Sequence, residues 1–125
     1  MSRAQGPLVL LVEDDLDIRD TMSELMEAEG YRVMTAGDGA EGIELLRAGN
    51  RPRAVLLDKF MPRLDGVAVL AAMAADAALS NIPVVWMSGD QQRPPSVAAI
   101  LNKPFNAESL MSTLRSVCDE SRPRQ

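Results

Sequence analysis

The stretch LVLLVEDD, Leu8–Asp15, decides the fold. Its first five residues are apolar with no polar alternation, which is typical of a strand that is buried on both faces. A second run of this kind, AVLL at Ala54–Leu57, also ends in an acidic residue, Asp58. Longer segments with apolar residues at helical spacing separate the apolar runs. Strands that alternate with helices predict an α/β protein with a parallel sheet covered on both sides.

Five strands and four helices are expected along the chain. The strands are predicted at 8–12, 31–35, 54–57, 83–87 and around 100–101. The helices are predicted from about 18 to a C-cap at Gly30, and over 38–48, 67–78 and 107–119. These elements form one domain over residues 8–119, with an N-terminal extension at 1–7 and a frayed tail at 120–125.

Composition excludes several classes of function. The chain has 125 residues and a net charge of −5, which disfavours unaided binding to nucleic acid or to an anionic membrane. It has no His, so a catalytic or metal-binding imidazole is excluded. A single cysteine, Cys118, cannot form an internal disulfide and fits a reducing compartment. No apolar stretch reaches the ~20 residues that span a bilayer, so a cytoplasmic location is expected.

Polar residues follow four of the five predicted strands, and they carry the chemistry of a candidate site. They are Glu13, Asp14 and Asp15 after the first strand, Asp58 after the third, Ser88 after the fourth and Lys103 after the fifth. The carboxyl ends of parallel strands meet at one edge of the sheet, where α/β proteins bind ligands. We therefore expect these acids, the hydroxyl and the lysine to converge.

Clustered carboxylates repel one another unless a cation offsets their charge, and Mg²⁺ with oxygen ligands is suited to do so. An ionised Asp58 beside Mg²⁺ could act as a nucleophile towards a phosphoryl group. Each residue also has a plainer interpretation. Asp14 or Asp15 could simply be the N-cap of the following helix. Asp58 could be a solvated acid, and Ser88 could belong to an ordinary turn.

Four segments together resemble the receiver domain of two-component response regulators. They are VLLVEDD at 9–15, AVLLDKFMPRLDG at 54–66, IPVVWMSG at 82–89 and KPF at 103–105. The resemblance covers about residues 8–118 and places every segment in the family's order. It implies a flavodoxin-like, three-layer α/β sandwich with a five-stranded parallel sheet of order 2-1-3-4-5.

The resemblance assigns the metal and phosphoryl chemistry to particular positions. Asp58 matches the phosphoacceptor. Glu13 and Asp14 match the acidic pair that, together with Asp58 and the backbone carbonyl of Phe60, holds Mg²⁺ directly or through water.

The remaining family positions concern the response to phosphorylation. Ser88 matches the hydroxyl that bonds the phosphoryl group, and Lys103 matches the lysine that pairs with it. Pro104 follows Lys103 through a peptide bond that is cis in most of the family. Ile100 stands where many receivers have Tyr or Phe, and Asp90 is assigned to the switch region beside Ser88.

The resemblance also implies partners. The phosphodonor would be a sensor histidine kinase or a histidine phosphotransfer protein, because this chain has no His of its own. A downstream target protein would read the phosphorylated form, with no direct role for nucleic acid or membrane and with a homodimer left open. The chain would be a stand-alone domain and no enzyme beyond its own phosphorylation and dephosphorylation.

The sequence departs from the family between Ser88 and Lys103. This interval is roughly two helical turns too short for the family's fourth helix, and Pro94 and Pro95 interrupt it. We therefore expect that helix to be shortened or absent. Trp86 has the same strand parity as Ser88, so it is predicted to pack under residues 89–99.

Three other functions share features with this sequence. The segment Gly37–Gly42 satisfies the G-x-G-x-x-G pattern of dinucleotide-binding proteins, but it follows the second strand and carries two acids. An aspartate-nucleophile phosphatase would need a second Asp two residues after Asp58, where this chain has Phe60. A receiver-like interaction module that is never phosphorylated is the remaining alternative.

Overall fold

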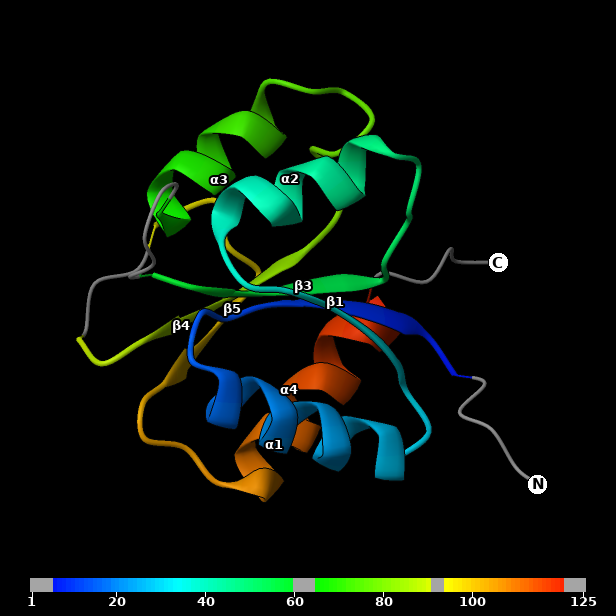
Figure 1. The fold of residues 1–125 in the computed structure, drawn as a ribbon, viewed down its shortest axis with the longest axis vertical. Helices are drawn as coiled ribbons and strands as arrows, with labels where there is room; N and C mark the ends of the chain where they lie inside the picture. The colour runs from blue at the N-terminus through cyan, green and yellow to red at the C-terminus, as the bar shows by residue number, and fades with distance from the viewer. Residues whose placement is uncertain (1–5, 60–64, 91–93, 121–125) are drawn as a thin grey trace.

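The five strands form one parallel sheet in the order β2-β1-β3-β4-β5 (Figure 1). The computed structural model describes residues 6–59, 65–90 and 94–120. The strands are β1 (Leu8–Val12), β2 (Arg32–Ala36), β3 (Ala54–Asp58), β4 (Val84–Ser88) and β5 (Ala99–Asn102). This order confirms the predicted topology.

Four helices in the described part of the chain complete a three-layer sandwich. They are α1 (Leu16–Ala28), α2 (Gly39–Arg47), α3 (Gly66–Ala74) and α4 (Ala107–Glu120). Helices α2 and α3 cover one face of the sheet, and α1 and α4 cover the other (Figure 1). Each helix is preceded by an Asp or Asn whose side chain accepts a backbone N–H of the first turn; these residues are Asp15, Asp38, Asp65 and Asn106.

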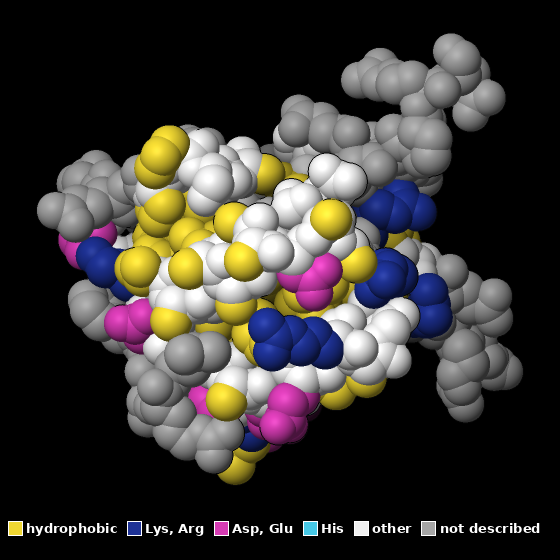
Figure 2. Space-filling view, turned by 90° about the horizontal axis from the view of Figure 1, so that it is seen from above, with side chains coloured by type: hydrophobic (Ala, Val, Ile, Leu, Met, Phe, Trp, Pro, Cys, Tyr) yellow, Lys and Arg dark blue, Asp and Glu magenta, His cyan; other side chains and the backbone are white. Residues whose placement is uncertain are grey.

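The sheet buries side chains on both faces. Alternate residues of the strands, such as Leu11 and Leu56, pack with α1 and α4, whereas Leu10 and Leu57 pack with α2 and α3. Every residue of β3 and β4 is buried, as the unbroken apolar runs predicted. Figure 2 looks onto the α2–α3 face, where hydrophobic side chains are spread over the helices and several Lys and Arg side chains gather at the right.

Several element boundaries differ from the sequence prediction by a few residues, and two of these differences have a local cause. Helix α3 ends at Ala74 rather than near Ala78, because the carboxylate of Asp76 accepts the backbone N–H of Ala78 at 2.9 Å and forms a turn there. Strand β2 begins at Arg32 rather than Tyr31. The N–H of Tyr31 donates to the carbonyl of Met26, so Tyr31 is part of the turn that follows α1.

The connection between β4 and β5 contains no helix in its described residues, 89–90 and 94–98. This agrees with the expected loss of the family's fourth helix, so α4 here is the helix that follows β5. Trp86 is only 1% exposed and belongs to the same buried cluster as Val97. Their shared cluster agrees with the predicted packing of Trp86 beneath this connection. No helix in the described part of the chain is long and apolar enough to cross a membrane.

Candidate functional site

Three carboxylates meet at the carboxyl ends of two neighbouring strands. Strands β1 and β3 are paired, with Val12 opposite Leu57, so Glu13 and Asp58 end side by side. One carboxylate oxygen from each of Glu13, Asp14 and Asp58 lies within 4.8 Å of the other two. Glu13 and Asp58 are buried, and Asp14 is exposed. The predicted convergence of acids is therefore present in the structure.

Lys103 brings a positive charge to these acids from the end of β5. Its Nζ lies 3.2 Å from Oδ2 of Asp58 and 3.4 Å from Oε1 of Glu13. Burial acts to lower the pKa of Lys103, but the two carboxylates outweigh burial and raise this pKa overall. Lys103 is joined to Pro104 by a cis peptide bond, as the resemblance implied.

The surroundings of Glu13 shift the pKa of its carboxyl group. Its burial, and then the nearby charge of Asp58, raise the pKa of this carboxyl above its ordinary value. The N–H of Asp15, donated to Oε2 at 3.2 Å, and the Lys103 ammonium act in the opposite direction without overcoming the rise. A buried carboxyl with a raised pKa gains from a cation ligand, since the cation favours its ionised form.

The structure separates the roles of Asp14 and Asp15. Asp15 is the N-cap of α1, and its Oδ1 accepts the N–H of Ile18 at 3.1 Å. Asp14 is the member of the pair that belongs to the carboxylate cluster. The capping interpretation therefore applies to Asp15.

The donor set fits Mg²⁺ by its chemistry. Glu13, Asp14 and Asp58 offer hard, anionic oxygens from one small volume, and Mg²⁺ binds through a few carboxylates while keeping several waters. The backbone carbonyl of Phe60, the fourth predicted ligand, lies outside the described residues.

Ser88 lies at the end of β4 and is held by Asp90. Its Oγ donates to Oδ1 of Asp90 at 2.9 Å and accepts the Asp90 N–H at 3.1 Å. The other oxygen of Asp90, Oδ2, lies 2.5 Å from Nζ of Lys59. No motif in the sequence assigns a role to Lys59; its place directly after Asp58 is the available signal. Ile100 is half-buried and packs against the core on the α2–α3 face.

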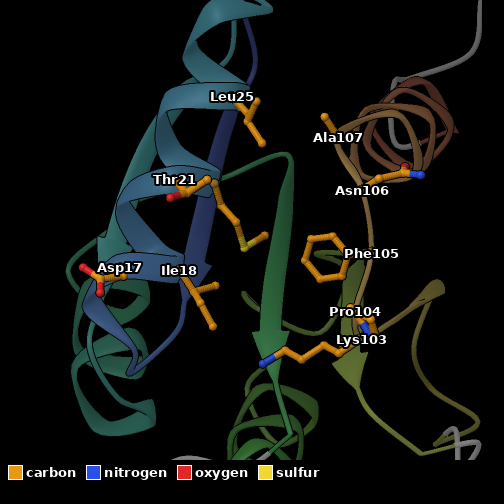
Figure 3. A pocket seen from close by; sticks show the side chains of 10 residues that line it. Asp17, Ile18, Thr21, Leu25, Lys103, Pro104, Phe105, Asn106 and Ala107 are labelled. Atoms are coloured by element: carbon orange, nitrogen blue, oxygen red, sulfur yellow. The ribbon is translucent and has the colours of Figure 1, made fainter.

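An apolar groove adjoins the carboxylate cluster (Figure 3). It has a volume of about 580 Å³ and lies between α1 and residues 103–107. Ile18 and Leu25 extend from α1, and the ring of Phe105 lies on the opposite side. Because Lys103 both lines the groove and contacts Asp58, the groove opens beside the acids.

The start of α2 does not support dinucleotide binding. The N–H of Gly37 donates to Oε1 of Glu41 at 2.8 Å, and the N–H of Glu41 donates to Oδ1 of Asp38 at 2.8 Å. Two of the N–H donors that would face a pyrophosphate are thus bound to the chain's own carboxylates.

The parallel sheet order, together with an acidic site at its carboxyl edge, defines a flavodoxin-like protein of the receiver type. The family model of the response regulator receiver domain matches residues 9–115. The chain belongs to this family.

Individual relatives agree with this assignment. The response regulator MprA of Mycobacterium sp. (strain KMS) is 32% identical over 122 residues, which cover 92% of this chain and 52% of that protein. The chain thus spans about half the length of the curated relatives it matches. The chemotaxis response regulator CheY4 of Vibrio cholerae has a similar structure, with a TM-score of 0.83, 27% identity and coverage of 90% of this chain and 99% of that one. The receiver domain of Francisella response regulator 1452 shares the fold, with a TM-score of 0.85, 24% identity and coverage of 94% and 100%.

Proposed function

We propose that this chain accepts a phosphoryl group on Asp58, with Mg²⁺ as cofactor, and signals through altered contacts with other proteins. One observation carries the proposal: Asp58 lies within reach of two further acids and of the Lys103 ammonium at the same edge of the sheet. Two acids suit a divalent cation, and a lysine suits the charge that a phosphoryl group adds.

The chemistry follows from this arrangement. A carboxylate oxygen of Asp58 attacks the phosphorus of a phosphohistidine on the partner, and the P–N bond breaks. The electron pair of that bond stays on the imidazole nitrogen, and Asp58 becomes an acyl phosphate. Glu13, Asp14 and Asp58 would hold Mg²⁺, and the ion would neutralise negative charge on the phosphoryl group. Lys103, beside Asp58, would pair with a phosphoryl oxygen.

Dephosphorylation returns the site to its starting state. A water molecule attacks the phosphorus, inorganic phosphate leaves, and the Asp58 carboxylate is restored. In this proposal the chain turns over no other substrate and is no enzyme beyond these two steps on its own side chain.

The phosphodonor in this proposal is a histidine kinase or histidine phosphotransfer protein in the cytoplasm. The apolar groove beside Lys103 supports a protein donor, because apolar side chains such as Phe105 offer buried contact area next to the reacting carboxylate. A downstream protein would then recognise the phosphorylated form.

Intact-mass measurement tests the proposal directly. The full chain is incubated with acetyl phosphate and Mg²⁺, and we expect the mass gain of one phosphoryl group. Asp58→Asn and chelation of Mg²⁺ should each abolish this gain. Asp20→Asn, which changes an exposed acid on α1, is the matched control and should behave as the wild type. A wild-type chain that never gains mass would instead favour the interaction module that is not phosphorylated.

A further inference from the structure

The Ser88 hydroxyl is committed to a partner other than the phosphoacceptor. Ser88 is 1% exposed, and its single hydroxyl proton is donated to Oδ1 of Asp90 at 2.9 Å. Its oxygen in turn accepts the Asp90 N–H at 3.1 Å. A hydroxyl has only one proton to donate, so Ser88 cannot keep this bond and also donate to a phosphoryl oxygen on Asp58.

Asp90 is itself held in place by a cation from the neighbouring strand. Its Oδ2 lies 2.5 Å from Nζ of Lys59, whose side chain is only 17% exposed. Lys59 directly follows Asp58, and its backbone N–H donates to the carbonyl of Met87 at 3.0 Å. The Asp90 carboxylate therefore joins the ends of β3 and β4 through Lys59 and Ser88.

We propose that Asp90, held by Lys59, is a positioning residue that keeps the Ser88 hydroxyl proton on its own carboxylate until a phosphoryl group replaces it as the acceptor. This inference rests on the proposed phosphorylation of Asp58. It adds that phosphorylation requires an exchange of acceptors at Ser88 and that the Asp90 carboxylate opposes this exchange. A hydrogen bond to an ionised acceptor is stronger than one to a neutral acceptor, so the charge of Asp90 sets the size of the opposition.

The effect of removing the acceptor follows from this difference. Asp90→Ala removes the charged acceptor altogether and should raise the initial rate of phosphorylation by acetyl phosphate and Mg²⁺ by about tenfold or more, the factor that a hydrogen bond to a charged group contributes. Asp90→Asn keeps a neutral acceptor in the same place and should give a smaller increase. Glu44→Ala removes one exposed acid on α2 and should leave the rate unchanged.

The Ser88→Ala background separates the positioning of the hydroxyl from the electrostatic effect of the Asp90 charge. Removing Asp90 also changes the electrostatic potential around Asp58 and Lys59, and that effect does not need a hydroxyl. In Ser88→Ala the hydroxyl is gone, so adding Asp90→Ala should change the rate less than about twofold. An acceleration of the same size in both backgrounds would assign the effect to charge and overturn the proposal, as would an Asp90→Ala variant that is no faster than wild type.

A double-mutant cycle on the stability of the unphosphorylated chain tests the contact between Ser88 and Asp90 without any phosphorylation step. Urea unfolding of Ser88→Ala, Asp90→Ala and the double variant should show coupling of at least about threefold in the unfolding equilibrium constant. If the two substitutions change the free energy of unfolding additively, the proposal that Asp90 holds Ser88 is overturned. This result decides the matter even if phosphorylation of Ser88→Ala is too slow to measure. A wild-type chain that takes up no phosphoryl group overturns the proposed function, and the cycle then still decides whether Asp90 positions Ser88.

Discussion

Gly66→Ala should destabilise the protein although it places a better helix former at the start of α3. A Cβ built on Gly66 would lie 2.8 Å from the backbone carbonyl oxygen of Asp58 and 2.9 Å from Cζ3 of Trp86. Favourable contacts between such atoms need about 3.5–4.0 Å. The Asp58 oxygen belongs to the backbone and Trp86 is fully buried, so neither can move aside freely.

The size of the loss follows from two opposing effects. Overpacking a buried site costs about 1–3 kcal/mol, whereas replacing Gly by Ala in a helix gains at most about 1 kcal/mol. A net loss of about 1–2 kcal/mol is expected. For a chain of this length it corresponds to a fall in Tm of about 4–8 °C.

Thermal unfolding followed by circular dichroism measures this change. Gly89→Ala is the matched control, because a Cβ at the exposed Gly89 would meet nothing within 4 Å. That variant should keep or gain stability by about 0.4–1 kcal/mol, since alanine restricts the unfolded chain. A Gly66→Ala protein with an unchanged or higher Tm would show that the Asp58 and Trp86 atoms yield more easily than the packing implies.

Three further predictions concern the acids and the tryptophan. Asp14→Asn should weaken Mg²⁺ binding because it removes an anionic ligand. Lys103→Ala should leave Mg²⁺ affinity equal or tighter but slow phosphorylation. Calorimetric titration in which both variants lose Mg²⁺ affinity equally would contradict these separate roles. Because the pKa of Glu13 is raised in the folded chain, its proton stabilises the metal-free fold below its ordinary pKa, and this contribution disappears as pH rises through the raised pKa. Urea unfolding across pH should show that Glu13→Gln loses this dependence, and an identical profile would refute it. Phosphorylation should also change the fluorescence of Trp86, which lies two residues before Ser88 in β4, and a spectrum unchanged at full phosphorylation would exclude that coupling.

The sequence predicts the sheet and the convergence of the acids well, because both depend on local patterns. Unbroken apolar runs mark β1, β3 and β4, and the residue after each run necessarily reaches the carboxyl edge. The positions of Glu13 and Asp58 follow from this rule alone, and that of Lys103 follows from the shorter apolar run in β5. Their grouping within a few ångström is what the structure adds.

The parts that the sequence could not supply depend on competition between neighbouring groups or on contacts across the fold. Alanine-rich composition predicts a helix to Ala78, but one side-chain hydrogen bond from Asp76 ends the pattern earlier. The pairing of Lys59 with Asp90 joins residues 31 positions apart, on segments that have no periodic signal. Neither contact has a counterpart in hydrophobic spacing.

The short connection between β4 and β5 also affects how firmly the site keeps its lysine. Residues 89–98 form the chain connection from β4 to β5, and a receiver with two additional helical turns has roughly seven more residues there. The effective concentration of a tethered segment falls as about the −3/2 power of tether length, so this β5 is held at about twice the local concentration. If β5 opens in a local fluctuation, it recloses more readily. The short connection thereby adds a contribution from chain entropy to the ion pairs that bring Lys103 back to Asp58 and Glu13.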